Sequence, residues 1–249
     1  MRYPICAMAM FLSLSLMGCS QNVLVPTPLA ANQQTRAMVI GDKLTYDVTS
    51  SADMGTYFLK EIKGTDIISV EAASNHDRAL PSKIVRTFDI KEVTNLDSGQ
   101  SNTSIMWCGQ DVSGTIYLLG MSKNGLDWGL VTDASYPVDT PSRLANGMAW
   151  SYTAHFSNGE SLSQNSKIVG IERISTPAGE FDAYKVQVFI KDSEGLVITG
   201  YQWIRPELGS IKMDMVVSRE KENHELKVHM VTILKSYRLV DKFRFKLFS

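Results

Sequence analysis

Apolar and polar residues alternate over much of the chain, which is the pattern of a strand with one buried face. Near the start, Leu44, Tyr46 and Val48 are separated by polar residues. The same period of two returns in five later segments: residues 148–156, 184–190, 197–203, 211–217 and 226–234. Successive side chains of a strand point to opposite faces, so these segments predict strands with one face on a core and one in water.

The apolar series of each segment is the one expected to face the core. In residues 197–203 that series is Val197, Thr199, Tyr201 and Trp203. Turn-forming residues separate the segments. Asn158-Gly159 is a strong hairpin signal, and residues 192–195, 206–209 and 220–223 are looser turns.

The regular spacing of strands and turns predicts an antiparallel meander and a mainly β fold, half-barrel or sandwich-like, with few or no long helices. One short helix is allowed around residues 139–146, where Thr140 and Pro141 resemble a cap followed by proline at the first helical position.

Residues 37–241 are expected to form one β-rich domain. A proline-containing stretch at 133–147 divides it into two halves that open alike, with a G-x-x-apolar-x-Tyr echo at Gly41 and Gly147. Such an echo is typical of a duplicated unit, so two subdomains remain the alternative.

The N-terminus has the layout of a secretory signal. Arg2 supplies the positive charge, and an apolar run extends from Ile5 to Leu16. A bilayer span needs about 20 apolar residues, so this run favours a cleaved signal over residues 1–18.

The end of that run, Leu16-Met17-Gly18-Cys19, resembles the lipobox of bacterial lipoproteins. The resemblance implies cleavage after Gly18, with Leu16 and Gly18 as recognition residues, and a lipid on the Cys19 thiol. Met17 departs from the smaller residue common at its place. Ser20 stands where an Asp would favour the inner membrane, so the resemblance implies an outer-membrane protein facing the periplasm in a Gram-negative cell.

Residues 19–36 are rich in proline and polar amides, which predicts a flexible tether behind the lipid. Cleavage would leave 24 Lys and Arg against 26 Asp and Glu, a net charge of −2. This balance gives no electrostatic case for nucleic acid as a partner. An apolar content of 44% suits a folded core.

The three cysteines have different expected fates if the chain is a lipoprotein. Cys6 leaves with the signal and Cys19 carries the lipid, so Cys108 has no partner for an intrachain disulfide. Its neighbours in residues 105–109 are apolar, which predicts a small buried hydrophobe rather than a reactive thiol. Trp107 and Trp128 are open to two interpretations, core residues or surface anchors.

No residue set indicates catalysis. The four histidines are His76, His155, His224 and His229, and the last two are five apart, which would put them on opposite faces of a strand. We therefore expect no metal, no cofactor and no catalytic residue. The acid pairs Asp89/Glu92 and Glu180/Asp182 and the abundant serines lack a supporting motif such as Gly-x-Ser-x-Gly.

Two motifs stand out in the C-terminal half. Residues 176–182 read T-P-A-G-E-F-D, where Pro177 presets φ, Gly179 permits a positive φ, and Phe181 is placed to pack back on the hairpin. Residues 203–209 read W-I-R-P-E-L-G. Together they resemble uncharacterised bacterial envelope proteins over about residues 147–235. The resemblance implies a curved antiparallel sheet, similar to the carriers of the LolA and LolB type, and implies no activity.

The last residues, 242–249, alternate cations with apolar side chains from Lys242 to Phe248. One hypothesis is contact with a membrane or an acidic partner. The alternative is an edge strand guarded by charge or a frayed end.

Three functions follow from these features. The first is a membrane-anchored envelope module that binds or scaffolds a protein partner without catalysis. The second is a binder or carrier of lipid or lipoprotein, suggested by the Lol-type resemblance and by the aromatic and Met-rich strands. The third is a hydrolase, because sites form from residues distant in sequence.

Overall fold

The structure is a computed structural model that describes residues 29, 32–53, 61–74, 79–123, 128–221 and 224–240. No helix occurs in these residues, and none therefore has the length and apolarity that a membrane span requires. The strands are β1 (Asn32–Gln34), β2 (Lys43–Asp53), β3 (Ile62–Ala72), β4 (Ile84–Leu96), β5 (Ser101–Asp111), β6 (Ile116–Ser122), β7 (Trp128–Leu130), β8 (Val138–Thr140), β9 (Arg143–Ala145), β10 (Ala149–His155), β11 (Ser161–Thr176), β12 (Gly179–Asp192), β13 (Leu196–Arg205), β14 (Gly209–Lys221) and β15 (His224–Arg238).

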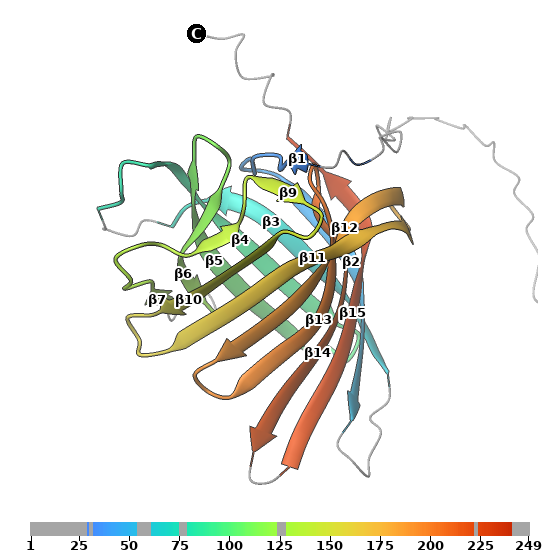
Figure 1. Cartoon of the computed structure of the whole chain (residues 1–249). Coiled ribbons are helices and arrows are strands. Elements are labelled where there is room, and N and C mark those ends of the chain that lie inside the picture. Colours follow the sequence, from blue (N-terminus) through green and yellow to red (C-terminus); the bar gives the residue numbers. More distant parts are fainter. Residues whose placement is uncertain are drawn as a thin grey trace, which may run out of the picture.

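Thirteen of these strands form one antiparallel sheet. Its order is β10-β11-β12-β13-β14-β15-β2-β3-β4-β5-β6-β7, with β8 paired to β6, while β1 and β9 form a separate pair. The sheet curls strongly (Figure 1). At one point its two ends meet, because Val131 after β7 bridges Phe156 after β10. The mainly β, curved antiparallel fold predicted from the sequence is therefore confirmed.

The two halves of the chain share this sheet. β15 pairs with β2 from Lys227–Asp53 to Arg238–Lys43, so the last strand of the second half lies beside the first long strand of the first half. Within the described residues, one continuous sheet contains the long strands of both halves.

The prediction of a short helix around residues 139–146 is wrong. The segment holds the end of β8 and all of β9, and β9 pairs with β1 in the register Asn32–Ala145 to Gln34–Arg143. The segment is extended because the backbone groups of residues 143–145 form hydrogen bonds with β1 rather than within a helical turn.

The tether assigned to residues 19–36 ends earlier than predicted. Besides β1, the Thr35 N–H donates to the Ser142 carbonyl over 2.9 Å, and the Arg36 guanidinium pairs with Asp42 over 2.5 Å. Asp42 is 3% exposed, so the pair fixes Arg36 to the sheet. The folded domain therefore includes Asn32–Arg36.

The alternation predicted from the sequence matches most strands. We call the side of the sheet that carries Tyr46, Val48, Val186, Val188 and Met215 the inner face; all five side chains are buried. Leu144 of β9 packs against this face and is fully buried. The alternating series of β10, β12, β14 and β15 also lie on the inner face, as expected.

β13 is the exception. Tyr201 pairs with Gln187 and Gly200 pairs with Val188, so Gly200 lies on the inner face and Tyr201 on the opposite, outer face. A Cβ on Gly200 would lie 2.1 Å from the Asp214 carbonyl oxygen, which leaves no room for a side chain there. The predicted core series from Val197 to Trp203 is thus on the outer face, where Tyr201 is 37% exposed and only Trp203 is buried.

The T-P-A-G turn forms as predicted. The Thr176 hydroxyl accepts from the Ala178 N–H over 3.1 Å, and Gly179 has a φ of 133°. Phe181 is 5% exposed and packs with Ala178 and Ile174, so it does return onto its own hairpin.

Candidate binding site

Several predicted site residues lie outside the described part of the chain. They are the lipid-attachment residue Cys19, the recognition residues Leu16 and Gly18, and the basic and aromatic tail at 242–249. His76 also lies outside it. Cleavage, lipidation and membrane contact by the tail stay predictions.

Cys108 is the small buried hydrophobe that the sequence predicts. It lies on β5, is 1% exposed, and packs with Val70, Phe88 and Ile116. Burial raises the pKa of the Cys108 thiol well above its ordinary value, which keeps the thiol protonated and unreactive. Its neighbour Trp107 is 2% exposed, so Trp107 is a core residue and not a surface anchor.

The described histidines do not converge. His155 Nδ1 lies 2.8 Å from Asp133 Oδ1, and His229 Nε2 lies 2.7 Å from Asp214 Oδ1. In the ranges that the structure describes, no three His, Cys, Asp or Glu side chains are grouped as metal ligands would be.

The two acid pairs considered from the sequence do not form paired carboxylates. Asp89 accepts from the Ser74 backbone and hydroxyl, and it lies on the face of β4 opposite to Glu92. Asp182 accepts from Arg173 over 3.1 Å, and no hydrogen bond links it to Glu180 among the described residues.

The two C-terminal motifs meet in a structural contact. Arg205 of the second motif donates to the Asp182 carbonyl oxygen of the first over 3.0 Å and pairs with Glu207 over 2.6 Å. The Pro206 carbonyl oxygen accepts from the Arg36 N–H over 2.8 Å. These residues bind the β11–β12 hairpin and the N-terminal segment to the sheet, so the motifs serve the fold.

The inner face changes character along its length. On β12, Val186 is fully buried and Val188 is 4% exposed, whereas Ile190 is partly exposed. Ile190 pairs with Ile198, Ile198 with Val217, and Val217 with Val228. We call these four residues the apolar row. All four are partly exposed, so the curled sheet is filled near β9 and opens to solvent at the apolar row.

Polar groups occupy the inner face on β3 and β4. Asp66 is 1% exposed and lies diagonally across the strand pair from Glu92. The Thr94 hydroxyl donates to Asp66 over 3.1 Å, and the Ser104 hydroxyl donates to Glu92 over 2.9 Å. The inner face therefore combines an apolar wall from β12 to β15 with a carboxyl pair on the opposite wall.

One proton is held at this carboxyl pair. Burial, followed by the negative charge of Glu92 and a hydrogen bond to it, raises the pKa of Asp66 to about 7. Asp66 is thus protonated in mildly acidic solution and can donate a hydrogen bond to Glu92.

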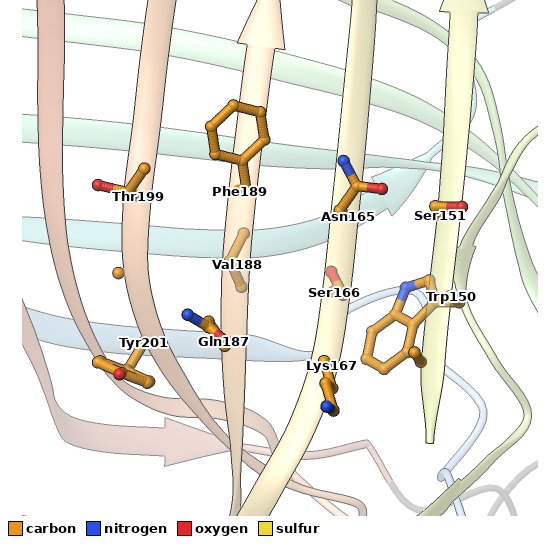
Figure 2. A pocket seen from close by; sticks show the side chains of 12 residues that line it. Trp150, Ser151, Asn165, Ser166, Lys167, Gln187, Val188, Phe189, Thr199 and Tyr201 are labelled. Carbon is orange, nitrogen blue, oxygen red and sulfur yellow. The ribbon is translucent and has the colours of Figure 1, made fainter. Parts of the chain in front are cut away.

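The outer face of β10–β13 holds a second candidate, a shallow depression of about 560 Å³. We call it the outer depression. Figure 2 shows its lining side chains, among them Asn165 and Lys167 of β11, Gln187 and Phe189 of β12, and Tyr201 of β13.

Sequence reasoning missed both the carboxyl pair and the outer depression. Asp66 could have been noticed, because it interrupts the apolar series of Ile62, Ile68 and Val70 on the buried face of β3. No sequence pattern pointed to the outer depression. The apolar alternation of β13 predicted that Tyr201 faces the core, whereas it lies on the outer face.

Comparisons with known proteins found only distant likenesses to solved structures. No family model and no curated protein matches the chain. An exported protein of Bacteroides fragilis with a YmcC-like fold is 14% identical, has a TM-score of 0.40, and aligns over 82% of this chain and 99% of its own. A Parabacteroides distasonis protein described as a lipoprotein is 15% identical, with a TM-score of 0.39 and coverage of 83% and 100%. A β-barrel-like DUF1849 protein of Brucella abortus is 9% identical, with a TM-score of 0.45 and coverage of 83% and 100%. Likeness at this level carries nothing about function.

Proposed function

We propose that this protein is a lipid-anchored lipoprotein of the bacterial envelope whose curled sheet is a non-catalytic binding module. The inner face is its binding surface. The observation that carries the proposal is the apolar row, because Ile190, Ile198, Val217 and Val228 lie on the inside of a curved sheet and still meet solvent. A contiguous row of partly exposed apolar side chains on the inside of a curved sheet is a candidate surface for a bound guest.

The anchor is supported by the sequence. The n-region, the apolar run and the lipobox-like ending at Cys19 together describe a lipoprotein signal, and Ser20 favours the outer membrane, facing the periplasm. Residues 20–31 would then separate the lipid from β1, which begins at Asn32. The module would work within a short distance of the membrane surface.

The first candidate guest is a segment of another envelope protein. A peptide lying along the apolar row would bury Ile198 and its neighbours, with a gain of roughly 25 cal/mol per Å² of apolar surface removed from water. Its polar groups would find acceptors in Glu92 and in the Ser104 hydroxyl on the opposite wall.

The second candidate guest is a lipid chain, as in a lipid or lipoprotein carrier. The observation that favours it is the methionine next to the apolar row, where Met230 is partly exposed and pairs with Met215. Methionine adapts its shape to irregular apolar partners such as acyl chains.

Photocrosslinking in living cells tests the binding surface. A photoreactive residue at Ile198, in the full lipoprotein, is expected to yield a light-dependent adduct. The same residue at Val112, which is 88% exposed between β5 and β6, is the matched control. A protein adduct would identify a partner and a lipid mass would identify a carrier. Equal background yields at both positions would contradict the proposal.

A further inference from the structure

The outer depression lies on the opposite side of the sheet from the proposed binding surface. Its side chains come in two rows across β10–β13: Ser151, Asn165, Phe189 and Thr199 in one, and Ala149, Lys167, Gln187 and Tyr201 in the other. Its volume of about 560 Å³ is within the usual range of small-ligand sites.

Two aromatic rings are exposed in this depression. Phe189 is 40% exposed and Tyr201 is 37% exposed, although both lie within long strands of the sheet. Phe189 pairs with Thr199 and Tyr201 with Gln187, so the two rings lie diagonally across neighbouring strands and offer two separate apolar contacts to a ligand.

The Tyr201 ring contacts two neighbouring side chains, Trp203 and Lys185. Its centroid lies 6.2 Å from that of Trp203, and the Lys185 ammonium lies 4.5 Å from the Tyr201 centroid. Trp203 is itself fixed, because its indole N–H donates to Glu172 over 2.8 Å. A ring fixed in this way loses little conformational entropy when it contacts a ligand.

The two side-chain amides of the depression are available for hydrogen bonds with a ligand. In the described part of the chain, neither Asn165 nor Gln187 makes a side-chain hydrogen bond, and both side chains are exposed. Each carboxamide can donate and accept at once, which suits a pair of neighbouring hydroxyl groups. The Ser151 and Thr199 hydroxyls extend the same capacity along the upper row.

The charge of the depression is slight. None of the described residues that line it carries a carboxylate, and Lys167 is the one cation among them; the Lys185 ammonium beside the Tyr201 ring is paired with Glu172. A lone lysine is too little for a nucleic acid backbone, and the free amides make a purely apolar guest unfavourable. The lining therefore suits a ligand with many hydroxyl groups, apolar C–H faces and little charge.

We propose that the outer depression binds an oligosaccharide. Pyranose rings present C–H groups on one face, and these pack against the negative face of an aromatic ring such as Tyr201 or Phe189. Their equatorial hydroxyls lie at the rim, within reach of the Asn165 and Gln187 amides. Lys167 gives a preference for a sugar that carries a carboxylate. The protein would thus contact envelope glycans with its outer face, whatever its inner face holds.

The test is saccharide binding by the chain from Ser20 to Ser249, which retains every described strand. The probes are hexasaccharides of β-linked glucose, of N-acetylglucosamine and of galacturonate, measured by calorimetry. The wild type is expected to bind at least one of them with a Kd below about 1 mM. Tyr201→Ala and Phe189→Ala are each expected to weaken that binding at least about tenfold, which corresponds to about 1.4 kcal/mol.

Val169→Ala is the matched control, because Val169 is 44% exposed on β11 and does not line the depression. Gln187→Ala removes an amide without removing a ring, so it tests the site even if an aromatic variant folds poorly. Lys167→Met should weaken only galacturonate binding. The proposal is overturned if no hexasaccharide binds, or if the Tyr201, Phe189 and Gln187 variants bind as Val169→Ala does. Crosslinking from Ile198 on the inner face is independent of either result.

Discussion

Asp66 shows how a single residue on the inner face makes stability depend on pH. Its pKa is raised to about 7 in the fold by burial and by Glu92, while an unfolded aspartate has a pKa near 3.8. The folded state therefore binds more protons than the unfolded state between these values. The stability that protonated Asp66 contributes is fully present below about pH 4 and is lost as the pH rises through about 7.

Asp66→Asn keeps a neutral donor beside Glu92 and removes the charge. We expect the advantage of the variant over the wild type in free energy of unfolding to grow by about 3 kcal/mol from pH 5 to pH 8, and to disappear toward pH 4. Urea unfolding at pH 5 and pH 8 measures the difference. Asp47→Asn, at an exposed position paired with Lys235, is the control. An advantage that stays constant with pH would contradict the account.

Gly200 is the residue that decides which side of β13 faces inward. A methyl group there would lie 2.1 Å from the Asp214 carbonyl oxygen and 2.8 Å from the Met215 Cα, both backbone atoms that cannot move aside easily. Gly200→Ala should destabilise the protein by about 1–3 kcal/mol, the usual cost of overpacking.

Gly170→Ala offers the comparison in the same sheet, since nothing lies within 4 Å of a Cβ at Gly170. Its effect on the urea midpoint is expected to be small. Equal midpoints for the two variants would show that Gly200 does not constrain β13.

At the scale of elements, the period of two predicted the strands well. Leu44, Tyr46 and Val48 on β2 are buried as expected, and so are Tyr184, Val186 and Val188 on β12. Periodicity identifies a strand because side chains must alternate, whatever the sheet around it.

The same period did not predict which face of β13 is buried. Both of its faces carry apolar residues, and the choice is made by Gly200 and by the close approach of β14. Packing of this kind depends on a neighbouring strand and cannot be seen in the local pattern. For this reason, the sequence did not predict the exposure of Tyr201, on which the oligosaccharide proposal depends.

β1 also lacked a local signal, because Asn32, Gln33 and Gln34 are polar and belong to a stretch that looks like a tether. The structure binds this segment through the backbone of β9 and through Arg36, whose partner Asp42 is 3% exposed. Backbone pairing and a single buried ion pair leave no hydrophobic pattern.

A chain that begins at Ala37 should therefore be less stable than one that begins at Ser20. It loses the β1–β9 pair and leaves the buried Asp42 carboxylate without Arg36, a change that costs about 3–5 kcal/mol in typical buried pairs. Thermal unfolding of the two chains measures the loss. Arg36→Ala in the longer chain separates the ion pair from the strand, and equal melting temperatures for all three would restore the tether interpretation.

The shape of the whole molecule follows from contacts between the ends of the chain. β15 lies beside β2, and Val131 meets Phe156, so the curled sheet depends on pairings between residues far apart in sequence. The sequence predicted the strands and the antiparallel class, and the resemblance implied the curvature. Strand order and the filling of the inner face by Leu144 could not be predicted, because no local pattern encodes them.

This shape gives the protein two surfaces with different chemistry. The inner face is apolar along Ile190, Ile198, Val217 and Val228, while the outer depression is aromatic and rich in amides. A single sheet could in this way hold a guest inside and contact a glycan outside, both close to the membrane that the predicted lipid on Cys19 would provide.

The central claim is that the inner face is occupied in the cell, and cysteine protection at Ile198 tests it most directly. Cys108 is buried and the Cys19 thiol would carry lipid, so the background reactivity of the chain is low. Ile198→Cys and the exposed control Val112→Cys are labelled with a maleimide in intact cells and again as purified, delipidated protein. The account predicts that Ile198→Cys reacts at least about tenfold more slowly in cells, relative to Val112→Cys, than after purification. The same ratio in both states would mean that nothing covers the apolar row and would contradict the account.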